Sequence, residues 1–261
     1  MTIGFISDIH ANLPALESVL DDVDRRRPDM IFCLGDLVGY APWPDDVVTM
    51  IRERRIPTIA GNYDEGVGLN SDDCGCAYKT DEDRSRGAES IAFTNKTVSD
   101  ATRAYLHGLP RHLRLTHQAA REAEALPFEI LMVHGSPRRI NEYLFEERPD
   151  RSFLRMMEIA GADLMLFGHT HKPYHKVLAY ELDGKTRYRH AINIGSVGKP
   201  KDGDPRASYV LLHLGDDTSS EHPAGLQVES VRVAYDVEKA ASAVEASPLP
   251  NAFAEMLRNA Y

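Results

Sequence analysis

Short apolar runs that end in polar residues are the feature of this sequence that most constrains its fold. Five such runs occupy residues 3–7, 30–34, 56–60, 129–133 and 164–167. The polar residues that follow them are Asp8, His10, Asp36, Asn62, His134, His169 and His171. Runs of this length are typical of buried strands, and in open α/β sheets ligands bind beyond the carboxyl ends of the strands. If the runs are neighbouring strands, these polar residues are expected to meet at one edge.

Helical patterns separate the first three runs. Apolar residues recur at helical spacing at Leu13, Leu16, Val19, Leu20 and Val23, and again at Val47, Val48 and Ile51. Alternation of strand and helix predicts βαβ units and an α/β fold. Further helices are predicted over residues 83–95 and 99–107, whereas the polar stretch 62–83 is predicted to be a long loop.

The chain beyond Pro173 changes character. Further apolar runs at residues 190–194 and 209–214, with turn signals between and after them, predict antiparallel strands and a second sheet. Amphipathic segments follow at about residues 236–261, and we expect these C-terminal helices to pack on the domain, with an oligomer contact as the alternative. The length of 261 residues fits a single α/β domain spanning residues 1–261.

The polar set at the ends of the runs has the composition of a metal site. It contains two carboxylates, one amide and four imidazoles, which would be costly to hold together without cations. Mixed imidazole and carboxylate ligation suits Mn, Fe, Co, Ni or Zn better than Ca or Mg. Seven ligands exceed the need of one ion, so we expect two divalent ions that share a bridging carboxylate.

Charge and cysteine content narrow the class of protein. The formal net charge of −10, from 30 basic and 40 acidic residues, disfavours bulk nucleic-acid binding, which depends on phosphate neutralisation. The sequence contains no run of 18 apolar residues, so it predicts no membrane-spanning helix. The three cysteines, Cys33, Cys74 and Cys76, do not fit a secreted disulfide framework, so a cytoplasmic protein with reduced thiols is expected.

The motifs together resemble the calcineurin-like metallophosphoesterase superfamily. They are DIH at residues 8–10, GD at 35–36, GN at 61–62, HG at 134–135 and GHTH at 168–171. The string NIGSVGKP at residues 193–200 resembles the YfcE-like phosphodiesterases of that superfamily. The resemblance implies a four-layer α/β/β/α sandwich with two mixed central sheets.

The resemblance also implies roles for the seven residues. Asp8, His10 and His171 match ligands of a first metal ion, and Asn62, His134 and His169 match ligands of a second. Asp36 matches the bridging ligand, and Asn62 also matches a contact to the substrate phosphate. The implied activity is a phosphodiesterase reaction, in which a hydroxide that bridges the two metal ions attacks phosphorus in line with the leaving oxygen.

Position 63 departs from the family pattern. Many members have a histidine after the Gly-Asn pair, but this chain has Tyr63. A phenol titrates near pH 10 and cannot serve as a cationic imidazole. The departure argues against fast monoester hydrolysis and against a protein phosphatase, and leaves Tyr63 either to hydrogen-bond a phosphate oxygen or to pack beside the site.

Other features leave alternatives open. Arg138 and Lys199 follow motif turns and are candidates for contacts to substrate phosphate, with a solvated surface position as the alternative. A dinucleoside polyphosphatase or a protein phosphatase is the alternative enzyme, and a non-catalytic metal or nucleotide sensor is the alternative of another class. The expected partner is a small phosphate ester or a nucleotide, and an oligomer is possible.

Overall fold

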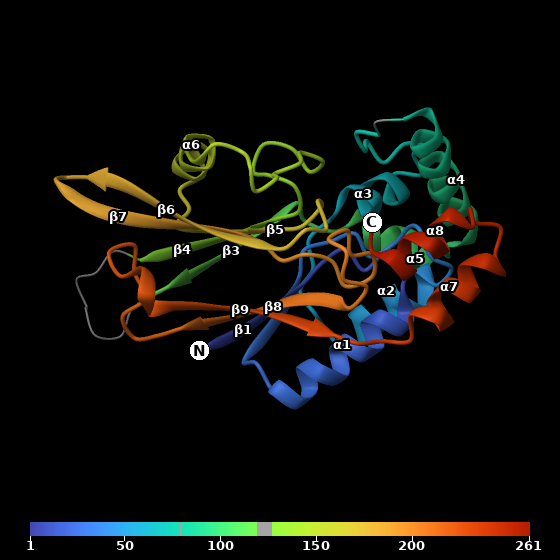
Figure 1. Ribbon diagram of the computed structural model, residues 1–261, viewed down its shortest axis with the longest axis horizontal. Coiled ribbons are helices and arrows are strands. Elements are labelled where there is room, and N and C mark those ends of the chain that lie inside the picture. Colours follow the sequence, from blue (N-terminus) through green and yellow to red (C-terminus); the bar gives the residue numbers. More distant parts are fainter. Residues whose placement is uncertain (79, 119–126) are drawn as a thin grey trace.

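Two sheets lie face to face, with helices on both outer sides (Figure 1). The computed structural model describes residues 1–78, 80–118 and 127–261. Helix α6 (Asp150–Ala160) covers one sheet, whereas α1 (Leu13–Arg26) and α2 (Pro44–Glu53) cover the other. The predicted four-layer α/β/β/α sandwich with two mixed sheets is therefore confirmed.

The first sheet joins the two ends of the chain. Its strands, in spatial order, are β2 (Met30–Cys33), β1 (Thr2–Ile6), β8 (Ala207–Leu214) and β9 (Leu226–Val233). Strand β1 is parallel to β2 and antiparallel to β8, so the sheet is mixed. A short 3-10 helix, η1 (Pro223–Gly225), precedes β9.

The second sheet is built from the middle of the chain. Its strands, in spatial order, are β3 (His112–His117), β4 (Phe128–Val133), β5 (Leu164–Phe167), β7 (Lys185–Asn193) and β6 (Tyr174–Leu182). Strands β4, β5 and β7 are parallel, and the strands at both edges are antiparallel to their neighbours.

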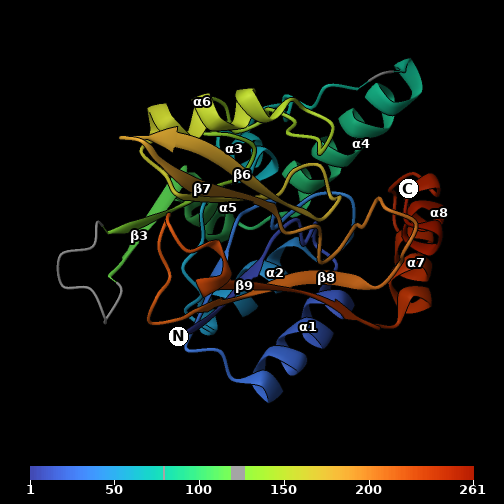
Figure 2. The ribbon, with the colours of Figure 1, turned by 60° about the vertical axis from the view of Figure 1, so that its left-hand side comes forward.

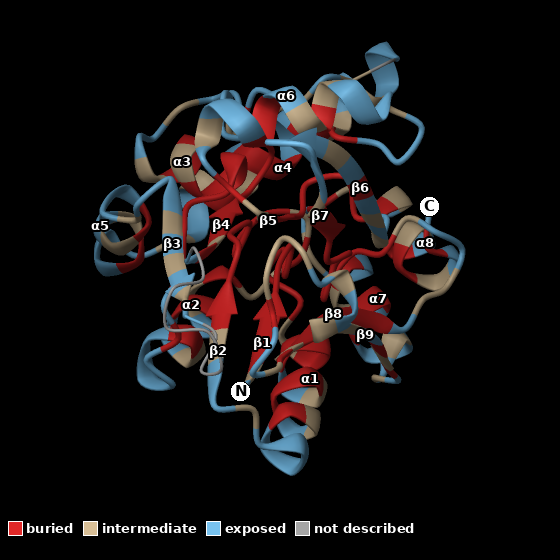
Figure 3. Cartoon of the chain, turned by 90° about the vertical axis from the view of Figure 1, so that its left-hand side faces the viewer, coloured by how far each residue is buried: buried red, intermediate tan, exposed pale blue. Residues whose placement is uncertain are grey.

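The alternation of side chains along the strands accounts for the layers. In β5, Leu164 and Leu166 face the other sheet, whereas Met165 and Phe167 face α6. Both faces of β5 and of its neighbour β4 are largely buried, and β4 is largely red in Figure 3, whereas the edge strands β3 and β6 are partly exposed. Buried apolar faces on both sides explain why these runs are continuously hydrophobic rather than alternating.

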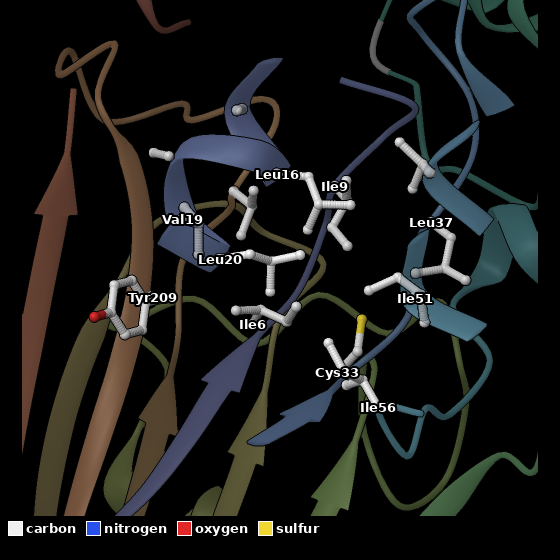
Figure 4. Packing of buried hydrophobic residues seen from close by; sticks show 14 of the residues in the cluster. Ile6, Ile9, Leu16, Val19, Leu20, Cys33, Leu37, Ile51, Ile56 and Tyr209 are labelled. Carbon is white, nitrogen blue, oxygen red and sulfur yellow. The ribbon is translucent and has the colours of Figure 1, made fainter. Parts of the chain in front are cut away.

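A third core lies between the first sheet and its helices. Side chains of α1 such as Leu16 and Leu20 pack near Ile6 of β1 and Cys33 of β2 (Figure 4). The side chain of Asn12 accepts a hydrogen bond from the amide of Ala15, which caps the start of α1. Cys33 is fully buried here, as its place in an apolar run predicts.

One prediction about the first half of the chain was wrong. Residues 56–60 form no strand and make only an isolated parallel bridge between Thr58 and Cys33, since Pro57 has no amide hydrogen to donate to a ladder. The apolar runs divide between the two sheets that the resemblance to the superfamily implies.

The polar stretch after the third run is partly helical. Helix α3 (Asn62–Gly68) occupies its beginning, so the predicted loop is shorter than residues 62–83. Asp64 explains the helix, because its side chain accepts a hydrogen bond from the amide of Gly61 at the helix start. The predicted helices that follow are confirmed as α4 (Asp81–Thr97) and α5 (Asp100–His107).

The C-terminal segment forms α7 (Val237–Glu245) and α8 (Ala252–Asn259), which lie together beside the first sheet and α1 (Figure 2). Their apolar faces form a core with Ala11 and Ala41, which belong to the loops after β1 and β2. That the whole chain is one domain stays a prediction. Among the described residues, every helix is too short or too polar to cross a lipid bilayer.

Candidate metal centre

The loops that carry the ligand-type residues meet at one edge of both sheets. Backbone hydrogen bonds join these loops: the amide of Asp8 donates to Gly35, that of His10 to Asp36, and that of Gly168 to His134. All seven predicted residues are buried, with no more than 3% of any of them exposed. The sandwich thus brings together residues that the sequence separates by up to 163 positions, from Asp8 to His171.

Six of these residues form two compact groups. The first is Asp8, His10 and His171, and the second is Asp36, His134 and His169. Within each group the ligand-type atoms lie within 4.8 Å of one another. In the first group, Nε2 of His171 lies 3.2 Å from Oδ1 of Asp8.

The seventh residue, Asn62, faces the second group. Its Oδ1 lies 3.1 Å from Nε2 of His134. Its Nδ2 donates to the carbonyl oxygen of Cys74 at 3.0 Å, so the amide oxygen points toward the centre and the nitrogen away from it.

Asp36 lies between the two groups. Its Oδ2 is 3.3 Å from Nε2 of His134 in the second group and 3.6 Å from Nε2 of His10 in the first. Its Oδ1 accepts a hydrogen bond of 2.9 Å from the amide of Tyr63, which fixes the carboxylate plane. A carboxylate in this position is suited to contact ions in both groups.

Backbone carbonyls fix the orientation of three imidazoles. Nδ1 of His10 lies 3.1 Å from the oxygen of Val38, that of His134 lies 2.8 Å from the oxygen of Leu34, and that of His171 lies 2.5 Å from the oxygen of Lys199. Since a carbonyl oxygen can only accept, each Nδ1 must carry the proton. In the neutral form of each ring, Nε2 therefore presents a lone pair to the centre.

These lone pairs test whether the residues fit metal ions. Nε2 of His10 and Nε2 of His171 lie 3.1 Å apart, and with both protons on Nδ1 neither can donate to the other. Nε2 of His169 is buried and has no hydrogen-bond partner within the described residues. Buried acceptors without donors are costly, and a divalent cation satisfies them. The donor set therefore fits two divalent metal ions.

Burial and mutual attraction set the charges of the site. Burial lowers the pKa of His10 and of His169 to about 3, which keeps both rings neutral, as metal ligation requires. Burial opposes ionisation of Asp8, but its attraction to His171, His134 and His10 holds the pKa of its carboxyl below the ordinary value. Burial disfavours the charged form of His134 as well, yet the neighbouring Asp36 raises its pKa to about 10, so a metal ion that binds this ring would displace a proton from it.

The backbone of the site is strained. Five of the seven residues have positive φ angles: Asp8, His10, Asp36, His169 and His171. Such angles are unfavourable for residues with a side chain, and they concentrate at functional sites. At Gly61, a Cβ atom would lie 2.1 Å from Oδ1 of Asp36, so only glycine permits this approach.

A cavity of about 450 Å³ opens from the two groups. His10, Asp36, His169 and His171 border it at one end. Its other walls are mainly aromatic and basic, and include Tyr40, Tyr63, Tyr143, Phe145, Lys199 and Lys201. Its size suits a small organic ligand.

The weaker sequence predictions divide between two cavities. Tyr63 and Lys199 border the cavity at the metal centre, as contact with a substrate requires. Arg138 does not: its guanidinium is ion-paired with Glu142, and it borders a separate cavity of about 430 Å³ on the outer side of the second sheet. The role of Arg138 in binding phosphate stays a prediction that the geometry does not favour.

Several supporting residues escaped the sequence analysis. Asp64 accepts hydrogen bonds from the amides of Leu37 and Gly61, and so ties together the loops that carry Asp36 and Asn62. Asn193 donates to the oxygen of Gly168 and to Thr170, which supports the GHTH turn. The NIGSVGKP string marks Asn193, but only the structure shows what it holds.

Cys74 and Cys76 approach the site from the loop after α3. Both are free thiols, and their sulfur atoms lie 3.1 Å apart. Cys76 also accepts a hydrogen bond from Nδ2 of Asn62 at 3.2 Å. The sulfur of Cys76 and the carbonyl oxygen of Cys74 thus help to hold Asn62 with its oxygen toward the second group.

Comparison with known proteins identifies the family. The profile of the calcineurin-like phosphoesterase superfamily domain matches residues 1–217. The chain belongs to this superfamily. It is 34% identical over 267 residues to the uncharacterized protein MJ0912 of Methanocaldococcus jannaschii, an alignment that covers 98% of this chain and 96% of that protein.

Solved structures share the fold. A metallophosphoesterase from Sphaerobacter thermophilus is 29% identical with a TM-score of 0.72, and the match covers 100% of this chain and 99% of that one. The hypothetical protein PH1004 from Pyrococcus horikoshii OT3 is 20% identical with a TM-score of 0.75, over 100% and 98% of the two chains. The chain is therefore a member of the metallophosphoesterases with two candidate metal-binding groups.

Proposed function

We propose that this metallophosphoesterase is a dinuclear metal-dependent phosphodiesterase. The observation that carries the proposal is the pair of buried ligand groups with Asp36 between them, at the end of a cavity large enough for a small phosphate ester. We assign Asp8, His10 and His171 to one ion, Asn62, His134 and His169 to the other, and Asp36 to both. Membership of the superfamily supports this assignment.

When bound, two such ions lower the pKa of a water molecule and neutralise charge on a phosphate group. The residues of this chain hold the metal ligands in position. The carbonyl oxygens of Val38, Leu34 and Lys199 hold three imidazoles with Nε2 toward the centre, so little reorganisation is needed during the reaction. Burial of all seven residues limits the access of water to the centre.

The preference for a diester rests on position 63. The ring of Tyr63 lies edge-on to His10, with 5.6 Å between ring centroids, and borders the cavity. Burial raises the pKa of its phenol well above the ordinary value of 10.0, so the hydroxyl stays protonated at neutral pH. Tyr63 is able to donate a hydrogen bond to a phosphate oxygen, but it is a poor proton donor to a leaving group.

Hydrolysis of two chromogenic esters tests the proposal. Bis-p-nitrophenyl phosphate and p-nitrophenyl phosphate are compared with Mn²⁺, Ni²⁺, Zn²⁺ or a chelator. We expect metal-dependent hydrolysis that favours the diester and falls by at least about 100-fold in His134→Ala, because a ligand of one ion is lost. His107→Ala serves as the control: His107 also precedes a glycine, but it lies exposed at the end of α5.

Each alternative has its own outcome. Preference for the monoester would reject the phosphodiesterase and restore the phosphatase alternative. No hydrolysis of either ester with any of the three metals would favour a non-catalytic metal or nucleotide sensor. An equal loss of activity in His107→Ala would show that the assay reports stability instead of ligation.

Tyr63→His is expected to raise monoester hydrolysis by about 10-fold, since it restores an imidazole able to protonate the leaving oxygen. The gain should be larger for phenyl phosphate than for p-nitrophenyl phosphate, because phenol is the poorer leaving group. The measurement is kcat/KM for both esters, with Tyr63→Phe as the control that removes only the hydroxyl. No gain would mean that geometry, and not the missing acid, sets the preference.

A further inference from the structure

Two lysines border the cavity at the metal centre without acidic partners. Lys199 is only 3% exposed, and its Nζ lies 3.4 Å from the sulfur of Met256 and 4.8 Å from the centroid of the Tyr40 ring. Lys201, two residues further on, borders the same cavity. Over residues 1–78, 80–118 and 127–261, neither lysine has a carboxylate within ion-pair distance. A buried amine without an anion is costly to keep charged.

The third basic residue at the cavity shows the contrast. Arg86 is ion-paired with Glu82 and Asp83, so its charge is already compensated. The two lysines are therefore the basic side chains of this cavity that lack a compensating carboxylate among the described residues. A negatively charged group of a ligand is the partner that they lack.

The lysines are fixed relative to the metal centre by the turn that carries them. The oxygen of Lys199 accepts the proton of Nδ1 of His171, and the amide of Lys199 donates to the hydroxyl of Ser196 at 2.8 Å. Ser196 in turn donates to the oxygen of Asp8. The turn that carries Lys199 thus also holds His171 and Asp8 of the first group in place. An anion bound at the two lysines would therefore lie at a defined place beside the phosphate that is cleaved.

Aromatic rings form another wall of this cavity. The ring of Tyr143 lies over that of His169, with 4.1 Å between centroids, and stacks on Phe145 with 5.7 Å and an interplanar angle of 12°. Phe145 is 42% exposed, which leaves part of its ring open to a ligand. Flat rings such as nucleobases stack on surfaces of this kind.

We propose that the preferred substrate is a phosphodiester of a nucleoside that carries a second phosphate group. The second phosphate binds Lys199 and Lys201, and the base packs against Tyr143 and Phe145. This inference rests on the proposed phosphodiesterase function and names its substrate class. A simple diester has one negative charge, which the ions would take, so the lysines call for a further anionic group.

A matched pair of substrates tests the second phosphate. The p-nitrophenyl ester of thymidine 5′-phosphate is compared with the same ester that also carries a 3′-phosphate. We expect the wild type to favour the 3′-phosphorylated ester by about 10-fold or more in kcat/KM. In Lys201→Met and Lys199→Met the ratio should fall toward one, because methionine keeps the bulk and removes the charge. Lys172→Met, at an exposed lysine outside the cavity, should keep the wild-type ratio.

Binding provides a second readout that does not need turnover. Calorimetry compares thymidine 3′,5′-bisphosphate with thymidine 5′-phosphate, for the wild type and for Lys201→Met. Tighter binding of the bisphosphate by about 10-fold, lost in the variant, supports the inference. Equal affinity for the two ligands in the wild type overturns it.

The two proposals fail in different ways. If both thymidine esters are hydrolysed at the same rate and both nucleotides bind equally, the phosphodiesterase stands and the second-phosphate site is rejected. If neither ester is hydrolysed but the bisphosphate binds more tightly through Lys201, the phosphate site at the two lysines is supported and the proposed phosphodiesterase activity is rejected.

Discussion

Replacement of Asp36 by asparagine is expected to weaken metal binding at both sites by at least about 100-fold, which exceeds the effect of losing a residue that only orients a ligand. Hydrolysis should fall on the order of 1,000-fold, because the ions supply several kcal/mol of charge stabilisation. The reason is the position of Asp36: its Oδ2 lies 3.3 Å from His134 and 3.6 Å from His10. No other carboxylate of the two groups is as close to histidines of both.

Asparagine suits this test because it keeps the shape of the side chain. Its amide oxygen is still able to accept the hydrogen bond from the amide of Tyr63, so the loop should keep its structure. Metal content by elemental analysis and affinity by calorimetry are the measurements. Asp163→Asn is the matched control, at the opposite end of β5, where the carboxylate accepts from the amide of Glu129.

Two results would contradict the shared-ligand assignment. Retention of two tightly bound ions by Asp36→Asn would show that Asp36 is not a ligand. Loss of only one ion would place Asp36 in one group alone, and the second group would then need another carboxylate.

Addition of Mn²⁺, Ni²⁺ or Zn²⁺ is expected to raise the unfolding temperature by about 10 °C or more relative to the chelated protein. An ion at 100 times its Kd stabilises the folded state by about 2.7 kcal/mol per site, so two sites give about 5 kcal/mol. In a chain of this size each kcal/mol shifts Tm by about 2–4 °C. The structural reason is that buried Nε2 lone pairs of His10 and His171 lack hydrogen donors, and that buried Nε2 of His169 has no hydrogen-bond partner among the described residues.

Thermal unfolding followed by circular dichroism measures this shift. Mg²⁺ at equal concentration is the control, and it should give the smaller shift, because a hard ion prefers all-oxygen ligands. The same unfolding temperature with transition metals and with chelator would contradict a metal centre built from these residues.

The local pattern of apolar residues was sufficient to predict many of the helices and strands. The helical spacing of Leu16 and Leu20 predicts α1, and most of the apolar runs are strands. The spacing of apolar residues shows which face of an element is buried, because residues on one face are three or four positions apart in a helix and two positions apart in a strand. Periodicity does not report which strands pair, so it did not show which run belongs to which sheet, nor that residues 56–60 lie beside β2 with a single bridge.

The candidate site shows the same division. The sequence determined its donor chemistry, because carboxylate and imidazole side chains at the ends of apolar runs are visible in the chain itself. The structure decided which donors share a group and which nitrogen of three of the histidines faces the centre. The orientation of these rings is set by backbone carbonyl oxygens of residues such as Val38 and Leu34. Every residue has a carbonyl oxygen, so the sequence does not show which of them binds a histidine.

The two basic residues that the sequence singled out show where tertiary structure was decisive. Arg138 and Lys199 both follow motif turns, and nothing local distinguishes them. In the structure Arg138 pairs with Glu142 in another cavity, whereas Lys199 is buried at the metal centre without an acidic partner among the described residues. The sequence determined which chemical groups this protein has at its motifs. Only the folded chain decided which of them meet, because their distances depend on contacts between segments far apart in the sequence.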